Sequence, residues 1–142
     1  MADQRRPRGL VDTSVVIDLE HLDLQDLPSE LAVSAVTMAE LAAGPHATSD
    51  PVERARRQDR LQRAEAIFDP LPVDADVARA YGRLYATVLA TGRKARGRRA
   101  FDLLIAATAL AAQLPLFTRY PDDFSDIVSL VEVIAVSPCS SQ

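Results

Sequence analysis

Short apolar runs alternate along the chain with longer stretches in which apolar residues recur at helical spacing. The apolar runs predict strands at residues 9–11, 31–36, 115–118 and 129–136, with a short edge-strand candidate at 70–73. Apolar residues spaced three or four apart predict helices over residues 15–22, 37–44, 51–69, 74–91 and 101–113. Strands that alternate with helices in this way predict an α/β fold, in which a parallel sheet carries helices on both faces.

The composition is that of one soluble domain. The chain has 142 residues, of which 48% are hydrophobic and 25% charged, and domains of roughly 100–150 residues form a single core. We expect the domain to cover residues 9–136, with a polar leader at 1–8 and a tail at 137–142. The longest uncharged run, residues 103–118, is shorter than the roughly 20 residues that span a membrane. The single cysteine, Cys139, cannot form an intrachain disulfide, which favours a cytoplasmic protein.

Acidic residues follow the predicted strands at several places. Asp12 ends the first strand, Glu40 lies in the helix after the second, and Asp102 opens the apolar helix. Asp122 and Asp123 follow the strand at 115–118. The carboxyl ends of parallel strands meet at one edge of a sheet, so we expect these carboxylates to converge. Because clustered carboxylates repel one another, and because oxygen ligands suit hard cations, the pattern predicts a Mg²⁺ or Mn²⁺ site.

Each acid also has a purely structural interpretation. Glu40 completes a capping-box pattern that begins at Thr37. Asp102 would stabilise a helix N-terminus through the helix dipole, and Asp12 would form a turn with the residues that follow it. The two acids after the strand at 115–118 would be ordinary loop residues. Only their joint placement at one sheet edge favours a shared metal pocket.

A basic segment precedes Asp102. The net charge of −4 excludes a nucleic-acid partner held by the mean charge of the protein, but it does not exclude a local basic patch. As a block of like charge the segment is typical of a solvated linker. Beside an acidic metal pocket it would instead contact the phosphates of RNA. Its cations are Arg93, Lys94, Arg96, Arg98 and Arg99.

Four segments in order resemble a known family. They are "GLVDTSVVIDL", "SAVTMAELAAG", "DLLIAATAL" and "LFTRYPDDF". Together they resemble the successive motifs of PIN-domain ribonucleases, and specifically the VapC-type toxins of bacterial VapBC toxin–antitoxin pairs. The resemblance covers residues 9–136.

The resemblance implies a three-layer α/β/α sandwich with a mainly parallel central sheet. It also implies a homodimer, a VapB-type antitoxin partner, and an endoribonuclease in which Mg²⁺ or Mn²⁺ activates a water that attacks the RNA phosphodiester bond. Asp12, Glu40 and Asp102 correspond to the acidic triad of the family. Asp12 and Asp102 would hold the principal metal, while Glu40 and a fourth acid would bind through water or a second metal.

The last motif matches the family less completely. Thr118 corresponds, but the family usually has Asn or Asp two residues later, where this chain has Tyr120. The fourth acid would then be Asp122 or Asp123. Ser14 would position Asp12 or a bound water. The departure at Tyr120 favours one alternative, a catalytically weak PIN-like module whose acidic pocket receives a basic antitoxin arm. A metal-dependent phosphatase of another α/β fold is disfavoured, because no nucleophile loop of the "DxDGT" type is present.

Overall fold

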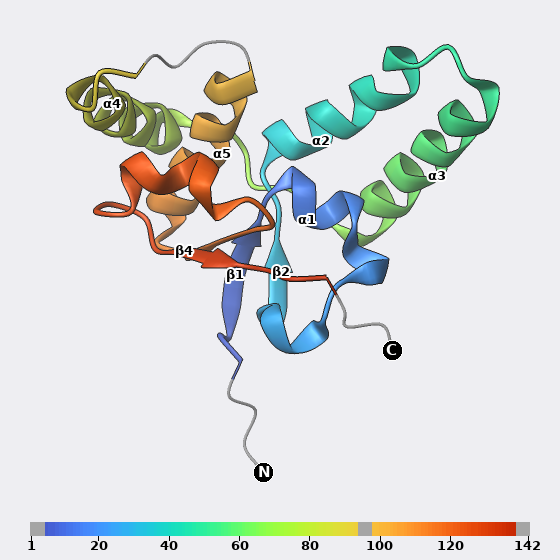
Figure 1. Cartoon of the computed structure of the whole chain (residues 1–142), viewed down its shortest axis with the longest axis horizontal. Helices are drawn as coiled ribbons and strands as arrows, with labels where there is room; N and C mark the ends of the chain where they lie inside the picture. Colours follow the sequence, from blue (N-terminus) through green and yellow to red (C-terminus); the bar gives the residue numbers. More distant parts are fainter. Residues whose placement is uncertain (1–4, 94–97, 139–142) are drawn as a thin grey trace.

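A four-stranded parallel sheet forms the centre of the molecule (Figure 1). The computed structural model describes residues 5–93 and 98–138. The strands lie in the order β2-β1-β3-β4, so β1 and β3 are the inner strands. Their bounds are β1 Arg8–Val11, β2 Glu30–Ala32, β3 Leu116–Thr118 and β4 Val133–Ala135. The predicted parallel sheet is confirmed.

Five α-helices accompany this sheet in the described part of the chain. They are α1 Thr13–Ile17, α2 Ala35–Ala43, α3 Pro51–Ile67, α4 Ala75–Ala90 and α5 Arg98–Ala112. Short 3-10 helices are η1 Leu19–His21, η2 Leu24–Asp26, η3 Gly44–Ala47 and η4 Pro121–Ile127. The helix predicted over 15–22 therefore divides at Asp18, and those predicted over 51–69, 74–91 and 101–113 agree with α3, α4 and α5 within three residues.

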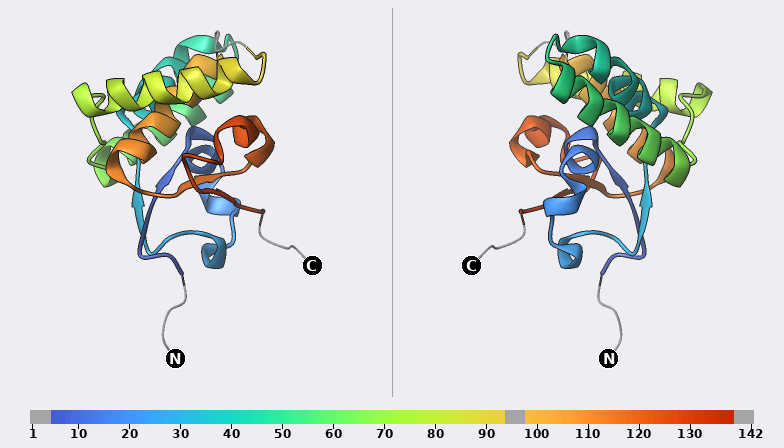
Figure 2. Two further views of the ribbon diagram at one scale, coloured as in Figure 1. Left: turned by 90° about the vertical axis from the view of Figure 1, so that its left-hand side faces the viewer. Right: turned by 90° about the vertical axis from the view of Figure 1, so that its right-hand side faces the viewer.

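The sheet separates two hydrophobic clusters, which makes three layers. Successive strand residues point to opposite faces, so Leu10 and Leu116 join α4, α5 and η4 in one cluster. Val11 and Phe117 join α1 and α3 in the other. Figure 2 shows these helices on the two sides of the strands. The three-layer α/β/α sandwich is confirmed, and the inner strand β1 is buried on both faces.

The second strand is shorter than predicted, and its helix begins earlier. Ser34, rather than Thr37, caps α2, because the Ser34 hydroxyl accepts a hydrogen bond of 3.0 Å from the Val36 N–H. Thr37 is fully buried inside the helix. The segment 70–73 forms only an isolated bridge, between Leu71 and Ser34, and the strand predicted over 129–136 is limited to Val133–Ala135.

Helix α3 lies along α2 and projects from the sheet together with it (Figure 1). Its predicted apolar stripe holds only in the C-terminal half, where Ala64 is buried, whereas Val52 is 68% exposed. At the N-terminal half arginines make the contact instead. Arg54 donates to the carbonyl oxygens of Pro45 and Thr48, and Arg57 to that of Gly44. These bonds satisfy carbonyl groups at the end of α2 and in the turn after it.

Within the described residues, none of the helices combines the length and the apolar character that crossing a membrane requires.

Candidate active site

Asp12 lies where the inner strand β1 ends and α1 begins. Its backbone is extended and its carboxylate caps α1, accepting hydrogen bonds from the Ser14 hydroxyl at 2.5 Å and the Val15 N–H at 3.2 Å. The Thr118 hydroxyl, at the end of the neighbouring strand β3, is a further partner. With 5% of its surface exposed, Asp12 is the buried carboxylate of the sheet edge, as the strand-end argument predicts.

Two backbone N–H groups orient the hydroxyls that bind Asp12. The Arg119 N–H donates to Ser14 Oγ at 3.2 Å, and the Tyr120 N–H donates to Thr118 Oγ1 at 3.1 Å. Because each hydroxyl has one hydrogen, accepting an N–H bond leaves that hydrogen free to point at the carboxylate. The segment after β3 therefore fixes the donors around Asp12. Tyr120 contributes through its backbone, so its side chain is not needed for this task.

Burial destabilises the charged form of Asp12, and its hydrogen bonds offset only part of that cost. Burial raises the pKa of this carboxyl above its ordinary value, and the hydrogen bonds from Ser14, Thr118 and Val15 lower it again by a smaller amount. Among the described residues, no arginine or lysine forms an ion pair with Asp12. A buried carboxylate without a cationic partner is energetically unfavourable, so a divalent cation bound by oxygen atoms fits this position.

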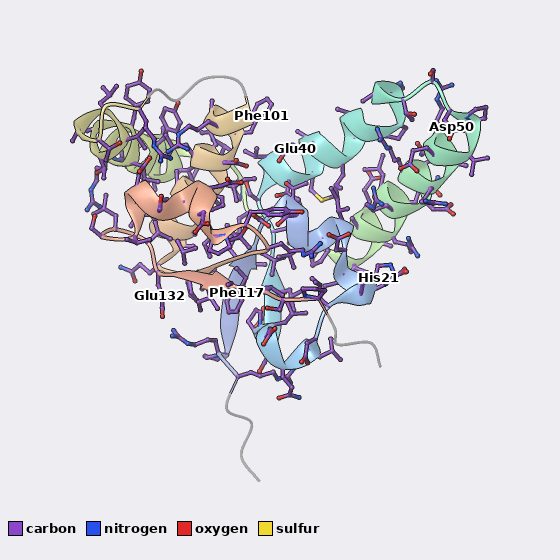
Figure 3. All side chains as sticks on the ribbon, in the orientation of Figure 1. His21, Glu40, Asp50, Phe101, Phe117 and Glu132 are labelled. Carbon is purple, nitrogen blue, oxygen red and sulfur yellow. The ribbon has the colours of Figure 1, made fainter. Side chains whose placement is uncertain are left out.

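Glu40 approaches the same strand end from α2. The Thr13 hydroxyl donates to its carboxylate at 2.6 Å, and the Thr37 hydroxyl lies 3.1 Å from that of Thr13. The capping-box alternative for Glu40 is wrong, because α2 starts at Ala35 and Glu40 lies in its middle. Glu40 thus contacts the residue directly after Asp12, and Figure 3 shows it at the same end of the molecule as Phe101.

Asp102 and Asp123 line one small cavity between α5 and η4, together with Arg99 and the apolar residues Leu103, Phe124 and Ile127. Asp122 is exposed and does not line it. Of the two acids after β3, it is thus Asp123 that lies near Asp102, as predicted.

Two features of the structure each bring a pair of these acids together. Asp12 and Glu40 are connected through Thr13, and Asp102 and Asp123 share the cavity beside η4. Within residues 5–93 and 98–138, no three His, Cys, Asp or Glu side chains are arranged so that they could hold a metal ion. Carboxylates at short separation repel one another. In this structure the carboxylates of Asp12 and Glu40 each accept a hydrogen bond from a hydroxyl group.

Two cations of the predicted basic segment, Arg93 and Arg99, lie beside Asp126 of η4. Arg99 forms an ion pair with Asp126, and Arg93 lies 3.6 Å from the same carboxylate. Arg98 is the first residue of α5, and Lys94 and Arg96 lie outside the described residues. The charges of Arg93 and Arg99 are therefore shared with Asp126, a carboxylate outside the predicted site.

An ion pair connects α1 to the segment after β3. Asp18, the C-cap residue of α1, pairs with the side chain of Arg119. The pair connects the end of α1 to the segment whose N–H groups orient Ser14 and Thr118. No local pattern signals a pair between residues 101 positions apart.

The sheet and its acidic carboxyl edge define an α/β domain with a carboxylate site at the ends of its inner strands. The PIN domain family matches residues 9–129. Ribonuclease VapC5 of Mycobacterium tuberculosis is 39% identical over 133 residues, which are 90% of this chain and 95% of the relative. Ribonuclease VapC8 of the same species is 40% identical over 71% of this chain and 89% of its own. The chain therefore belongs to the PIN-domain family, within its VapC group.

Solved structures agree with this assignment. The structure of VapBC-5, a toxin–antitoxin system of M. tuberculosis, matches with a TM-score of 0.79 and 38% identity, over 91% of this chain and 98% of that chain. FitAcB of Neisseria gonorrhoeae matches with a TM-score of 0.65 and 27% identity, over 88% of this chain and 95% of that one.

Proposed function

We propose that this protein is a VapC-type toxin that cleaves RNA phosphodiester bonds as an endoribonuclease and depends on Mg²⁺ or Mn²⁺. The membership of the PIN-domain family and the curated VapC ribonucleases support the reaction class. The observation that carries the proposal is the buried Asp12 carboxylate, which has oriented hydroxyl donors and no cationic partner among the described residues.

Asp12 and Asp102 would hold the principal metal. Glu40 and Asp123, or Asp122 in its place, would bind through water or a second ion. All these groups are carboxylates, the ligand type that Mg²⁺ and Mn²⁺ prefer over zinc. When bound, the metal would activate water for in-line attack and stabilise charge on the leaving oxygen. Ser14 and Thr118 keep the Asp12 carboxylate in one orientation and favour its charged form, because both donate hydrogen bonds to it.

We infer a VapB-type antitoxin as the protein partner. Several solved relatives are VapBC complexes, including VapBC-5 of M. tuberculosis and VapBC2 of Rickettsia felis. We also propose a homodimer in the cytoplasm. Tyr81 and Tyr85 on α4, whose ring centroids are 6.0 Å apart, are candidates for its interface, since Tyr85 is partly exposed.

The cleavage reaction can be tested with purified protein. We expect discrete cleavage of total RNA in Mg²⁺ or Mn²⁺ that is abolished by EDTA, by Asp12→Ala and by Asp102→Ala. Asp59→Ala, which removes an exposed carboxylate of α3, serves as the matched control and retains cleavage. Cleavage that survives chelation and both active-site substitutions would exclude the metal-dependent mechanism.

A catalytically weak binding module is the second candidate. It is favoured by Tyr120, which stands where the family usually has Asn or Asp. Its signature would be tight binding of a VapB-type antitoxin by a protein that leaves RNA intact in both metals.

A further inference from the structure

A groove extends from Glu40 along α2 and α3, which we call the Glu40 groove. Its volume is about 670 Å³, within the range of roughly 300–1,000 Å³ that ligand sites occupy. The residues important here are Thr13, Ile17, Glu40, Arg57, Arg60 and Phe101. Because Glu40 belongs to the proposed metal site, a substrate that reaches this site can continue into the groove.

Arg60 differs from the other arginines of α3. The helix carries five, and four of them have partners: Arg54 on carbonyl groups, Arg56 and Arg57 on Glu53, and Arg63 on Glu20. Arg60 has no hydrogen bond or ion pair with any described residue, yet its side chain is only partly exposed. The charge of Glu53 is balanced by Arg56 and Arg57. Arg60 is therefore the groove's cation that is available to a phosphate.

Phe101 supplies an aromatic surface at the other side of the groove. It directly precedes Asp102 on α5, and it lines the groove together with Glu40. It is 51% exposed, although a predominantly apolar helix predicts a buried residue there. An exposed aromatic ring beside a carboxylate site matches the way proteins hold unpaired nucleotides, through stacking of a base on the ring.

We propose that the Glu40 groove binds single-stranded RNA, with one base stacked on Phe101 and a backbone phosphate bound by Arg60. The proposal rests on the ribonuclease function and assigns its substrate a path from the carboxylates towards α3. Within the groove the phosphate contact would come from Arg60 on α3, whereas Arg93 and Arg99 of the predicted basic segment share Asp126. An open aromatic ring and an unpaired guanidinium on one groove match the base and the phosphate of a nucleotide.

Binding of a fluorescein-labelled single-stranded RNA of mixed sequence, followed by anisotropy in EDTA, separates the two contacts. Phe101→Ala should weaken binding about 5- to 150-fold, the effect of one lost stacking contact, with an unchanged salt dependence. Phe101→Leu should weaken it similarly, whereas Phe101→Trp should retain it. Arg60→Gln should lower the slope of log K against log salt by about 0.7, and Arg60→Lys should keep the slope.

The control is Arg83→Gln, which removes an exposed arginine of α4 and should bind RNA like the wild type. Binding within about twofold of wild type for Phe101→Ala and Arg60→Gln would overturn the proposal. If those variants instead lose affinity for an arginine-rich peptide, the groove belongs to a protein partner. Wild-type protein that binds RNA in the groove but cuts none in Mg²⁺ or Mn²⁺ would refute the ribonuclease function alone.

Discussion

Removal of the Ser14 hydroxyl measures how strongly the fold holds the Asp12 carboxylate. Ser14 donates to Asp12 at 2.5 Å and accepts from the Arg119 N–H at 3.2 Å. A hydrogen bond to a charged group contributes about 1.5–3 kcal/mol, and the second bond about 1 kcal/mol. We therefore expect Ser14→Ala to lower the free energy of unfolding by about 3 kcal/mol at pH 7. For a domain of this size the melting temperature would fall by about 10 °C.

The loss should depend on pH. Asp12 has a pKa above its ordinary 3.8, so the folded state binds this proton more tightly than the unfolded state does. Ionisation of Asp12 therefore lowers the free energy of unfolding as the pH rises from the pKa of the unfolded state through the higher pKa of the folded state. Without the Ser14 hydroxyl the folded pKa rises further and the penalty grows. Below pH 3.8 Asp12 is protonated in both states, and only neutral hydrogen bonds of about 1 kcal/mol each are lost.

Urea unfolding, followed by circular dichroism in EDTA at pH 7 and near pH 4, tests this reasoning. Ser125→Ala, at an exposed serine of η4, should stay within about 0.5 kcal/mol of wild type, and Ser14→Thr should keep most of the stability. A loss for Ser14→Ala that is equal at the two pH values would refute the proposed coupling to Asp12.

Three further substitutions test the packing and the charges around the site. Gly9→Ala would place a methyl group 2.3 Å from the buried ring of Phe117, so we expect a loss of about 1–3 kcal/mol in urea unfolding; an unchanged midpoint would contradict this packing. Asp12→Asn removes the buried charge, so this variant should melt above wild type at pH 7, with the gain vanishing towards pH 4. Asp18→Asn should change the free energy of unfolding by at most about 1 kcal/mol but lower kcat about tenfold at constant KM. The reason is that Asp18 holds the side chain of Arg119, whose backbone N–H orients Ser14. An unchanged kcat would argue against that role.

Most of the fold could be predicted because the strands are strongly apolar. Leu10 and Val11 are buried on opposite faces of the sheet, which explains why the run that contains them has no polar alternation. The start of α2 was missed because Ser34 and Thr37 carry equivalent cap signals. Packing decides between them: Thr37 is needed inside the helix, where it lies beside Thr13.

The site could be predicted only where an acid ends a strand or enters a helix at the sheet edge. Asp12 and Glu40 satisfy that rule. The donors that orient Asp12 could not be found, since Ser14 and Arg119 are 105 residues apart in sequence. The exposure of Phe101 could not be predicted, because its helix is predominantly apolar and only the folded structure places this residue in the groove beside Glu40.

Titration of Mn²⁺ into wild-type protein and Asp12→Asn tests the central claim, that the Asp12 carboxylate binds the metal on which RNA cleavage depends. Electron paramagnetic resonance would measure Mn²⁺ binding, and RNA cleavage would be measured in the same samples. The account predicts saturable Mn²⁺ binding and cleavage by the wild type, with both lost in a folded Asp12→Asn protein. Cleavage by Asp12→Asn at the wild-type rate, or wild-type cleavage without bound metal, would contradict it.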